Sequence, residues 1–565
     1  MCRMRFIALI AVVAFVLPAS QPLSGTGAEP FRARQRLVLS ASGMASQVGA
    51  EVMNEGGNAI DAAVATAFAL AVTHPTAGNI GGGGFLVYRA AQGESIVYDF
   101  REMAPPGSAP TMWLKDGKYD FNTHHLSYLS VGTPGTVAGL HMAWKDKGSV
   151  PWKRLVEPAV KLARDGFMVS PGLARSLKGI LDDMKPFPAS VAQFSKNGVP
   201  YEAGNTLRQP DLAKTLERIA RLGPAGFYEG ETAQLIDKEM RAHGGLVTLE
   251  ALKAYKAVKR EPVKGSYRGY DVISVSPPSG GGVALIEMLN LLEGFDLGAS
   301  GFGSARTIHP IVESMRRAYA DRAQHMGDPD FNGDMPVAKL ISKPYADELR
   351  RTIDLRTASV SSPTSFAWRH ESDETTHLSI VDTQRNAVSM TYTLEYGYGS
   401  RIVVPGAGFL LNNEMGDFNA GPGLTNADGL IGTDPNLARP GKRMLSSMTP
   451  TILTKDGKLF MVTGSPGGRT IINTVLHTIL NVVDFKMGAQ DAVDAGRFHH
   501  QWLPDRVTYE RNALSPDTLG ILKGMGHAMQ EGGSQGVAEV IIDRDGDGLE
   551  GGVDRRQADG GAAGR

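Results

Sequence analysis

Two adjacent threonines, Thr375 and Thr376, stand where the character of the chain changes abruptly, about two-thirds of the way along. The polar, charge-flanked segment 369–374 precedes them, and an alternating pattern through Val381 follows, which is typical of a strand. A threonine at such a junction is a candidate for both a cleavage site and a nucleophile. An ordinary loop-to-strand transition has the same pattern, so residues 374–382 alone leave both interpretations open.

A threonine hydroxyl is a weak nucleophile unless a base removes its proton. No arrangement of histidine and carboxylate is evident here, but a free α-amine can be the base, because its ordinary pKa of about 8 lets it accept a proton near neutral pH. That amine exists only if the peptide bond between Glu374 and Thr375 is cut, which the Thr375 hydroxyl could do by attacking the preceding carbonyl. The sequence therefore suggests a precursor that activates itself.

A second threonine is placed by the turn that follows this strand. The periodicity of two resumes over Ala387–Thr393, with a hairpin connection before it. If Asp382 and Asn386 face each other across a loop of about three residues, Thr375 lies opposite Thr393. A slip of one residue would send Thr393 to the other face of the sheet, so this prediction depends on the turn.

Other polar groups also follow predicted strands. Arg101 comes directly after the strand expected over Ile96–Phe100, and an arginine there can hold a carboxylate through two parallel hydrogen bonds. A surface ion pair with Glu102 or Asp99 explains the same residue equally well. Polar groups gather beyond Thr393 as nowhere else in the chain: Glu395, Asn412–Asn413–Glu414, Asp417, Ser446–Ser447 and Gly464–Gly468, with a loop rich in proline and glycine over Gly421–Lys442.

The composition is that of a globular protein without a strong net charge. The 565 residues are 42% hydrophobic and 21% charged, and 58 basic side chains nearly balance 59 acidic ones, for a formal charge of -1. This balance predicts no attraction to nucleic acid or to an anionic membrane. The 68 glycines, about 12% of the chain against a usual share of about 7%, predict many tight turns or close backbone contacts.

The N-terminus has the pattern of a signal peptide. Two arginines precede an apolar run over Phe6–Leu17, which is shorter than the roughly 20 residues of a membrane-spanning helix. Small residues predict cleavage after Ala28, with Ala19 as the other candidate, so we expect a periplasmic or secreted protein, and an uncleaved anchor is the alternative. Cys2, the only cysteine, would be removed, leaving no disulfide, thiol nucleophile or thiolate metal site.

Helical and strand periods alternate along the rest of the chain. The helical pattern over Ser42–Val72 breaks at Gly56–Gly57, where Asn58 would cap a second helix. Residues 133–260 are predicted to be mainly helical and to act as scaffold. Further expected elements are strands over Phe85–Tyr88 and Val537–Ile542, helices over Pro158–Arg164, Leu207–Leu222 and Arg306–Gln324, a strand, glycine turn and helix between Val272 and Leu292, and an exposed linker over Thr357–Ser372.

Several short patterns match known motifs without the context that those motifs require. Residues 543–554 resemble a calcium loop, yet Glu550 stands where an apolar residue is usual and no flanking helices are evident. Gly532–Gly536 spells a hydrolase elbow, but a strand follows it where a helix is required. The pairs His124–His125 and His499–His500 lack the helical spacing that lets two imidazoles share one ion, so they are interpreted as structural and no metal is predicted.

Longer motifs are more specific and are spread over nearly the whole chain: Gly56–Ala63, Asp99–Pro105, Ala318–Arg322, Thr375–His377, Leu411–Asn413, Leu445–Met448 and Gly464–Gly468. Together they resemble the γ-glutamyltransferase, or glutathione hydrolase, family of the N-terminal-nucleophile superfamily. The resemblance implies an α/β fold, a four-layer αββα sandwich, without a cofactor. It also implies self-cleavage between Glu374 and Thr375 into a large subunit, 29–374, and a small subunit, 375–565, that stay together.

The resemblance assigns roles to individual residues. Thr375 would attack the γ-carbonyl of glutathione or another γ-glutamyl compound, the Thr393 hydroxyl would assist it, and the backbone amides of Gly467 and Gly468 would form an oxyanion hole. Water or an amino acid would then resolve the γ-glutamyl ester, which gives hydrolysis or transpeptidation. The substrate's α-carboxylate would be held by Arg101, Ser446 and Ser447, and its α-ammonium by Glu395, Glu414 and Asp417.

Some positions depart from the family pattern. Relatives carry either an acidic residue or an amide at Glu395, many have an aspartate at Gly416 and a serine at Arg469, and Gly421–Lys442 resembles a lid that only some members have. The alternatives are an acylase for β-lactam side chains, a poly-γ-glutamate depolymerase and an uncleaved exported binding protein. The residues for a zwitterion argue against the acylase, because a glutaryl group has no α-ammonium, and the lid argues against a polymer, which needs an open groove.

Overall fold

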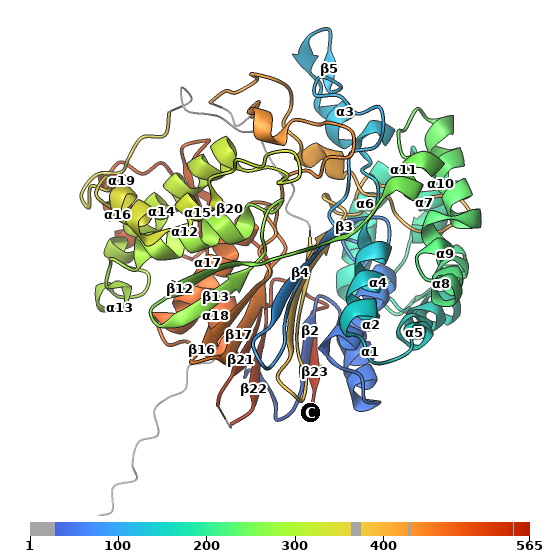
Figure 1. Ribbon diagram of the computed structural model, residues 1–565, viewed down its shortest axis with the longest axis horizontal. Helices are drawn as coiled ribbons and strands as arrows, with labels where there is room; N and C mark the ends of the chain where they lie inside the picture. Colours follow the sequence, from blue (N-terminus) through green and yellow to red (C-terminus); the bar gives the residue numbers. More distant parts are fainter. Residues whose placement is uncertain (1–28, 363–374, 428–430, 546) are drawn as a thin grey trace, which may run out of the picture.

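The computed structural model describes residues 29–362, 375–427, 431–545 and 547–565, so the predicted signal peptide and Glu374 lie outside the described residues. Two seven-stranded sheets lie face to face, and helices cover the outer side of each (Figure 1). Every pairing within these two sheets is antiparallel. The predicted αββα sandwich is therefore confirmed.

The first sheet carries Thr375 at its centre. The two strands that follow this residue, β14 and β15, lie between β2 and β3, which come from the N-terminal part of the chain. In spatial order the strands are β11 (Val258–Arg260), β4 (Ser95–Asp99), β3 (Gly83–Arg89), β15 (Ala387–Thr393), β14 (Thr376–Val381), β2 (Leu37–Ser40) and β23 (Gly561–Gly564).

The second sheet also mixes strands from before and after Thr375. Its central strand β17 leads into the predicted oxyanion loop. In spatial order the strands are β1 (Phe31–Ala33), β22 (Leu549–Val553), β21 (Glu539–Asp543), β17 (Lys458–Gly464), β16 (Thr451–Lys455), β13 (Tyr270–Ser274) and β12 (Val263–Tyr267). The two predicted subunits are therefore interleaved in both sheets.

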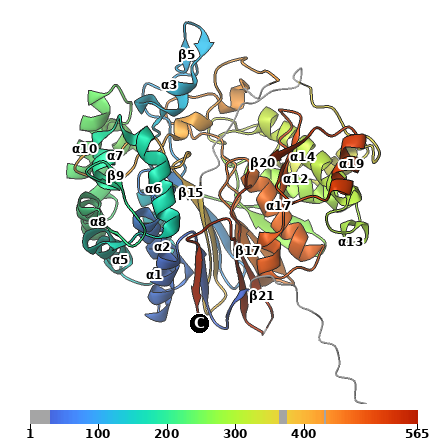
Figure 2. The same cartoon turned by 180° about the vertical axis from the view of Figure 1, so that it is seen from behind.

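Two helical layers enclose the sheets, as the opposite views in Figures 1 and 2 show. The layer over the first sheet contains α1 (Gly43–Asn54), α2 (Ala59–Thr73), α4 (Thr136–Lys147), α5 (Trp152–Asp165), α6 (Pro171–Met184), α7 (Pro188–Phe194), α8 (Pro210–Leu222), α9 (Ala225–Tyr228), α10 (Gly230–Ala242) and α11 (Leu249–Ala254). The layer over the second contains α12 (Gly281–Leu292), α13 (Leu297–Ser300), α14 (Ala305–His325), α15 (Val337–Leu340), α16 (Lys343–Arg350), α17 (Thr470–Val483), α18 (Ala489–Asp494) and α19 (Pro516–Gly524).

Several short strands and one short helix lie outside the two main sheets. The hairpin β5 (Leu114–Lys115) and β6 (Lys118–Tyr119) and the short helix α3 (Phe121–His125) project together from one end of the sandwich (Figure 1). The other short strands are β7 (Phe167–Met168) with β10 (Thr206–Leu207), β8 (Ser195–Lys196) with β9 (Val199–Pro200), and β18 (Phe498–His499), β19 (Val507–Glu510) and β20 (Met529–Gly532).

The three interfaces between the four layers each have a hydrophobic core. Leu378 and Ile380 of β14 pack beneath the first helical layer, whereas Val381 belongs to the core between the sheets. There it shares a cluster with Val87 of β3 and Ile452 of β16. Both faces of β14 are buried, which fixes the strand that begins next to Thr375 because a shift of one residue would exchange its two faces.

The predicted hairpin register is confirmed. Val381 pairs with Ala387 and Thr376 with Tyr392, so Thr375 and Thr393 face each other at the next position. The turn is closed by the Asp382 N–H, which donates to the Asn386 carbonyl at 3.0 Å.

The predicted break between the first two helices is also confirmed. Gly56 adopts a φ of 98°, a left-handed conformation that glycine tolerates. The Asn58 side chain accepts hydrogen bonds from the backbone N–H groups of Ile60 and Asp61, and the Asp61 carboxylate accepts the Asn58 N–H. This reciprocal cap starts α2 at the predicted residue.

Several element boundaries differ from the prediction, and three of them show where the sequence pattern was misleading. Helix α8 begins at Pro210, because Leu207 instead pairs with Phe167 in the β10–β7 ladder. Helix α5 begins six residues before Pro158, which lies inside it. Strand β21 starts only at Glu539, because the preceding Val537 N–H donates to the Ser465 hydroxyl instead of joining the ladder.

Candidate active site

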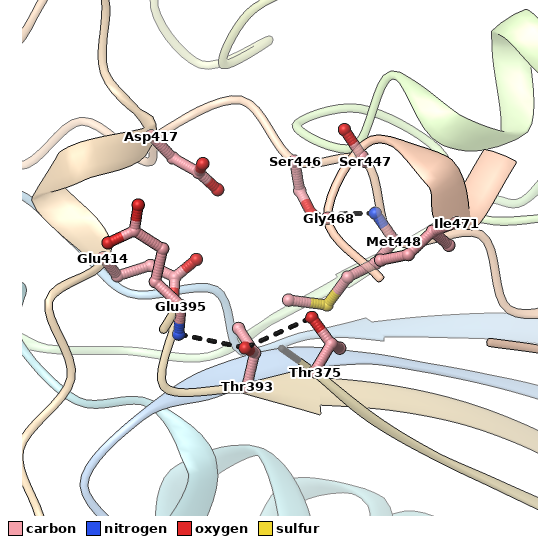
Figure 3. A pocket seen from close by; sticks show the side chains of 10 residues that line it. All are labelled: Thr375, Thr393, Glu395, Glu414, Asp417, Ser446, Ser447, Met448, Gly468 and Ile471. Carbon is pink, nitrogen blue, oxygen red and sulfur yellow. Dashed lines mark hydrogen bonds between the residues drawn. The ribbon is translucent and has the colours of Figure 1, made fainter. Parts of the chain in front are cut away.

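Thr375 and Thr393 form a pair of hydroxyls at the end of β14 and β15 (Figure 3). The Thr375 hydroxyl donates to the Thr393 hydroxyl oxygen at 3.3 Å, and the Glu395 N–H donates to the same oxygen at 2.9 Å. The Thr393 carbonyl accepts from the Asn79 side-chain amide at 2.9 Å, which holds this strand end in place. Thr393 can therefore orient the Thr375 hydroxyl.

The two threonines open into a small pocket of about 290 Å³. Part of this space is open to solvent, and most of the lining side chains are polar, which suits a small polar group. Acidic side chains lie on one side of the pocket, and serines with a glycine turn lie on the other (Figure 3). The lining residues are Thr375, Thr393, Glu395, Glu414, Asp417, Ser446, Ser447, Met448, Gly468 and Ile471.

The acidic side comes from two segments. Glu414 and Asp417 belong to one short 3₁₀ helix, η3 (Glu414–Asp417), whereas Glu395 follows β15 directly. Glu395 has a φ of 78°, a left-handed conformation that costs a residue with a side chain about 1 to 3 kcal/mol and is concentrated at functional sites. The chain therefore bends sharply to bring this carboxylate into the pocket.

Arg101 lies behind the acidic side and is fully buried. Its guanidinium binds the carboxylates of Glu414 and Asp417, one through each terminal nitrogen. The predicted pair of parallel hydrogen bonds to a single carboxylate is therefore not what the structure shows, because each terminal nitrogen binds a different carboxylate of the protein. The surface ion pair that was the alternative is wrong, because the contact with Glu102, at 3.6 Å, is buried.

Burial dominates the electrostatics of this cluster. It raises the pKa of Glu414 to about 8, although the charge of Arg101 opposes the shift, and it raises the pKa of Glu102 to about 8 in the same way. Burial alone would lower the pKa of Arg101, but Glu414, Asp417 and Glu102 outweigh it and raise that pKa. Near neutral pH the guanidinium therefore does not face three full negative charges.

Ser446 and Ser447 lie on the opposite side of the pocket, and Arg322 of α14 supports them from outside the lining. The Ser446 hydroxyl accepts the Met448 N–H at 3.1 Å, and the Ser447 hydroxyl accepts from the Arg322 guanidinium at 2.8 Å. Arg322 is part of one of the sequence motifs but received no role there. The structure places it where it orients Ser447.

Gly467 and Gly468 form the turn between β17 and α17. Their φ angles of 124° and 52° lie in the left-handed region, which favours glycine. Gly468 lines the pocket, and the N-terminus of the 14-residue helix α17 follows directly, an arrangement that favours negative charge. The place is suitable for a developing oxyanion.

A family model for gamma-glutamyltranspeptidase matches residues 45–564. The chain belongs to the γ-glutamyltranspeptidase family. The glutathione hydrolase proenzyme of Escherichia coli (strain K12) is 47% identical over 536 residues, which cover 94% of this chain and 92% of that protein. The fold and the site described above are thus those of a γ-glutamyltranspeptidase family member.

Two solved structures also resemble this family member. A cephalosporin acylase from Bacillus halodurans has a TM-score of 0.84 at 27% identity, covering 98% of this chain and 99% of the acylase chain. A γ-glutamyltranspeptidase from Helicobacter pylori has a TM-score of 0.56 at 46% identity, covering 60% of this chain and 95% of that chain. The sandwich is therefore shared by proteins whose names denote different reactions.

The structure brings most of the predicted site residues of this family member to one pocket. Arg101 lies directly behind the lining, Gly467 adjoins it in the β17–α17 turn, and Glu374 lies outside the described residues. Those that line the pocket are Thr375, Thr393, Glu395, Glu414, Asp417, Ser446, Ser447 and Gly468.

Besides Arg322, sequence reasoning missed two supporting residues. Asn412, within a quoted motif, accepts the N–H groups of Gly132 and Glu414 through its side-chain oxygen. His125, interpreted only as structural, has its Nδ1 3.1 Å from a Glu395 carboxylate oxygen. No local pattern indicates the second contact, because the two residues are far apart in the sequence.

The proline- and glycine-rich loop is tied to the site. Residues 428–430 lie outside the described residues, but the 3₁₀ helix η4 (Asp434–Asn436) is present in the same loop. The Asn436 amide donates to the Asp417 carbonyl at 2.7 Å, and its oxygen accepts the Leu445 N–H at 2.8 Å. The loop thus links η3 to the segment that carries the serines.

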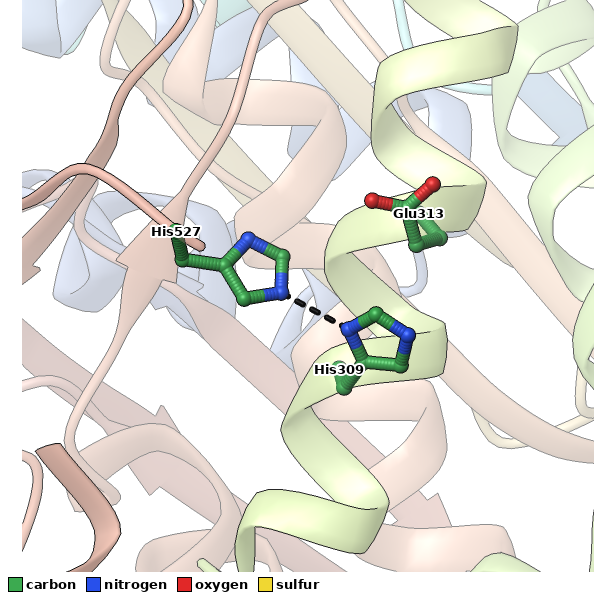
Figure 4. Close-up of side chains that lie close together, drawn as sticks. All are labelled: His309, Glu313 and His527. Atoms are coloured by element: carbon green, nitrogen blue, oxygen red, sulfur yellow. Dashed lines mark hydrogen bonds between the residues drawn. The ribbon is translucent and has the colours of Figure 1, made fainter. Parts of the chain in front are cut away.

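One group among the described residues has the composition of a metal site: His309 and Glu313 on α14, with His527 (Figure 4). None of the three lines the pocket. The facing nitrogens of the two imidazoles are already joined by a hydrogen bond of 2.7 Å. The Glu313 carboxylate is paired with Arg316 and Arg317, so a bound cation would sit beside two guanidiniums. We therefore interpret the group as a structural network.

This network changes the interpretation of the predicted linker. Of Thr357–Ser372, residues 357–362 are described, and their backbone is held firmly. The Ser359 N–H donates to Glu313 at 3.1 Å, and the Ser361 N–H donates to Asp505 at 2.8 Å. The prediction of an exposed linker holds only in part here: Thr357 and Val360 are exposed, but Ser361 is buried, and two carboxylates bind the backbone.

Replacing Thr393 with valine is expected to slow both self-cleavage and turnover by about 10²-fold, a typical contribution of one positioned proton-transfer group. The change removes the hydroxyl that orients Thr375 and leaves the Glu395 N–H without its acceptor. Band intensities over time and release of a chromogenic anilide measure the two rates. Thr393→Ser keeps the hydroxyl and should retain most of both; equal rates for the valine and serine variants would refute this role.

Proposed function

We propose that Thr375 is the nucleophile of a self-processing γ-glutamyltransferase and glutathione hydrolase. The observation that carries the proposal is the Thr375–Thr393 hydroxyl pair at the base of a pocket with carboxylates on one side and serines with a glycine turn on the other. The 47% identity to a glutathione hydrolase proenzyme supports both the activity and the precursor form.

The first step converts the precursor into two chains. The Thr375 hydroxyl attacks the carbonyl of Glu374, the peptide C–N bond breaks, and the amine nitrogen takes the hydroxyl proton. Water hydrolyses the resulting ester to a carboxylate on Glu374 and a free amine and hydroxyl on Thr375. The large subunit, residues 29–374, and the small subunit, residues 375–565, stay associated because their strands alternate in both sheets.

Turnover then uses the new amine as the base. It takes the proton of the Thr375 hydroxyl as the oxygen attacks the γ-carbonyl of the substrate, and the amides of Gly467 and Gly468 donate to the developing oxyanion. When the tetrahedral intermediate collapses, the leaving amine takes the proton from the ammonium group and departs. Water or the amine of an acceptor repeats these steps on the γ-glutamyl ester, which gives glutamate or a new γ-glutamyl amide.

Substrate binding exchanges ion pairs within the acidic side of the pocket. The substrate's α-carboxylate approaches Arg101, Ser446 and Ser447, while its α-ammonium takes over carboxylates that now bind Arg101. Both new pairs are charge-assisted, so the zwitterion replaces internal contacts with equivalent ones. This arrangement selects small γ-glutamyl compounds such as glutathione and requires no cofactor or nucleic acid.

Export through the N-terminal signal peptide completes the proposal. No helix among the described residues is both long and apolar enough to cross a bilayer. The apolar run at the N-terminus and the small residues up to Ala28 support a periplasmic or secreted enzyme.

Denaturing electrophoresis combined with an anilide assay tests the proposed function. Purified protein should separate into two bands whose smaller chain begins at Thr375 by N-terminal sequencing, and it should release p-nitroaniline from L-γ-glutamyl-p-nitroanilide. Release should accelerate when a dipeptide acceptor is added if transfer contributes. A single full-length band after prolonged incubation would favour the uncleaved binding protein and contradict the enzyme.

An acylase is the second candidate, because the cephalosporin acylase structure superimposes over nearly the whole chain. The two activities differ at the α-carbon of the substrate, where a glutaryl group lacks the ammonium that the acidic side of the pocket would bind. We expect γ-glutamyl compounds to be cleaved in preference to glutaryl compounds. Faster cleavage of a glutaryl amide would reassign the protein as an acylase.

A further inference from the structure

His125 reaches the active-site pocket from a distant element. It is the last residue of α3, and its Nδ1 lies 3.1 Å from the Glu395 carboxylate. Both side chains are buried, with exposed fractions of 6% for His125 and 4% for Glu395. Glu395 in turn follows Thr393 by two residues and lines the pocket. The contact between His125 and Glu395 thus connects the projecting hairpin and helix to the lining of the active-site pocket.

The protonation state of His125 bears on which partner donates the hydrogen bond in this contact. Burial lowers the pKa of His125 to about 3, so the ring is neutral at physiological pH and carries one N–H. If the carboxylate accepts in this contact, the proton of the ring is on Nδ1, the nitrogen that faces Glu395. A neutral donor orients a carboxylate without cancelling its charge, so a carboxylate held in this way can still accept from a cation in the pocket.

The His125 ring is held from several directions. Phe121 stacks on it at a centroid distance of 4.6 Å, and Tyr396 lies parallel to it within 4° at 5.4 Å. The Asn413 side-chain amide donates to the His125 carbonyl at 3.1 Å, which ties the end of α3 to the segment that carries Glu414. The imidazole therefore has little freedom to turn away from Glu395.

Gly416 leaves the space that this contact needs. A Cβ at position 416 would lie 2.3 Å from the His125 Nδ1 and 2.6 Å from a Glu395 carboxylate oxygen, closer than atoms can approach. The histidine and the carboxylate thus occupy the volume where any residue other than glycine would place its side chain. The departure from the family pattern at Gly416 is explained by this packing.

We propose that His125 is a positioning residue that fixes the Glu395 carboxylate as an acceptor for the substrate's α-ammonium group. It thereby determines the preference for γ-glutamyl over glutaryl compounds. The inference rests on the proposed function and deepens it. His125 touches neither the nucleophile nor the reacting carbonyl; it acts on binding at the far end of the substrate, so its loss should reduce selectivity and leave self-cleavage complete.

The selectivity ratio tests this role. For wild type, His125→Leu and His125→Asn, kcat and KM are measured with L-γ-glutamyl-p-nitroanilide and with glutaryl-p-nitroanilide. The leucine variant should lose about tenfold in the ratio of the two kcat/KM values, mainly through a higher KM for the γ-glutamyl substrate. Asparagine places an amide N–H where Nδ1 stands and should restore most of the ratio. His243→Leu removes a half-exposed imidazole outside the pocket lining and serves as the control for the loss of a histidine, with a ratio within about twofold of wild type.

A second variant keeps the proposal testable if His125→Leu fails to fold. Gly416→Ala places a methyl group against both partners and should lower the ratio as His125→Leu does. The proposal would be overturned if His125→Leu or Gly416→Ala were processed into two bands and kept the wild-type ratio of kcat/KM values. Equal losses of this ratio in His125→Leu and His125→Asn would also overturn it. Failure of the proposed function is distinguishable, because the wild-type protein itself would then release no p-nitroaniline from the γ-glutamyl substrate.

Discussion

Replacing Thr375 with alanine is expected to leave a single full-length band and to reduce release from a γ-glutamyl anilide by at least about 10³-fold. Both losses follow from one missing hydroxyl, because the same oxygen would open the peptide bond and later attack the substrate. The fold should survive, since the residue stands before the first ladder pair of β14. Electrophoresis, anilide release and circular dichroism measure the three outcomes.

Two variants act as controls for this result. Thr375→Ser keeps a hydroxyl and should recover partial cleavage and turnover. Thr376→Val alters the adjacent threonine, whose buried hydroxyl has no hydrogen-bond partner, and should be processed normally. If Thr375→Ala were cleaved at the wild-type position while Thr376→Val was not, the wrong threonine would have been chosen.

Arg101→Met is expected to lower both stability and substrate affinity. The change leaves the buried carboxyl groups of Glu102 and Glu414 and the partly buried one of Asp417 without their cation, and breaking a buried pair in this way typically costs about 3 to 5 kcal/mol. kcat/KM for the γ-glutamyl anilide should fall by about 10²-fold or more, because the α-carboxylate loses its guanidinium. Urea midpoints, compared in the uncleaved Thr375→Ala chain to keep one polypeptide, measure the stability loss.

The stability loss should depend on pH. The pKa of Glu414 is raised in the folded protein, so its contribution to stability is full in acid and is lost as pH rises through about 8. Arg101 lowers this pKa, and its removal raises it further, so the difference between Arg101→Met and wild type should be larger at pH 9 than at pH 6.

A matched control separates this cluster from ordinary ion pairs. Arg154 pairs with Glu55 while both side chains are more than half exposed, so Arg154→Met should change stability by less than about 1 kcal/mol. Equal midpoints for Arg101→Met and Arg154→Met, with unchanged kinetics, would contradict a special role for Arg101.

The local parts of the site could be predicted from the sequence because short-range rules decide them. A three-residue turn sets the β14–β15 register, and the register alone brings Thr393 to Thr375. The cap at Asn58 similarly fixes the start of α2 from four adjacent residues. Such features depend on neighbours in the chain, where residue type and spacing carry the information.

The long-range parts could not be predicted in the same way. Arg101 meets Glu414 across 313 residues of sequence, and His125 meets Glu395 across 270. Which carboxylate an arginine binds depends on strand order, which no local pattern specifies. The family resemblance assigned Arg101, Glu414 and Glu395 to the same substrate, but it did not indicate that Arg101 and Glu414 bind each other.

The alternation of strands from both sides of Thr375 has a consequence for durability. While the chain is continuous, refolding is a unimolecular search; after the cut, the strands of two separate molecules would have to interleave again in both sheets. Heat inactivation of the mature enzyme should therefore be a one-way process, governed by how fast the sandwich opens and not by an equilibrium between folded and unfolded forms. Cleavage therefore makes the enzyme active and also removes its ability to refold as a single chain.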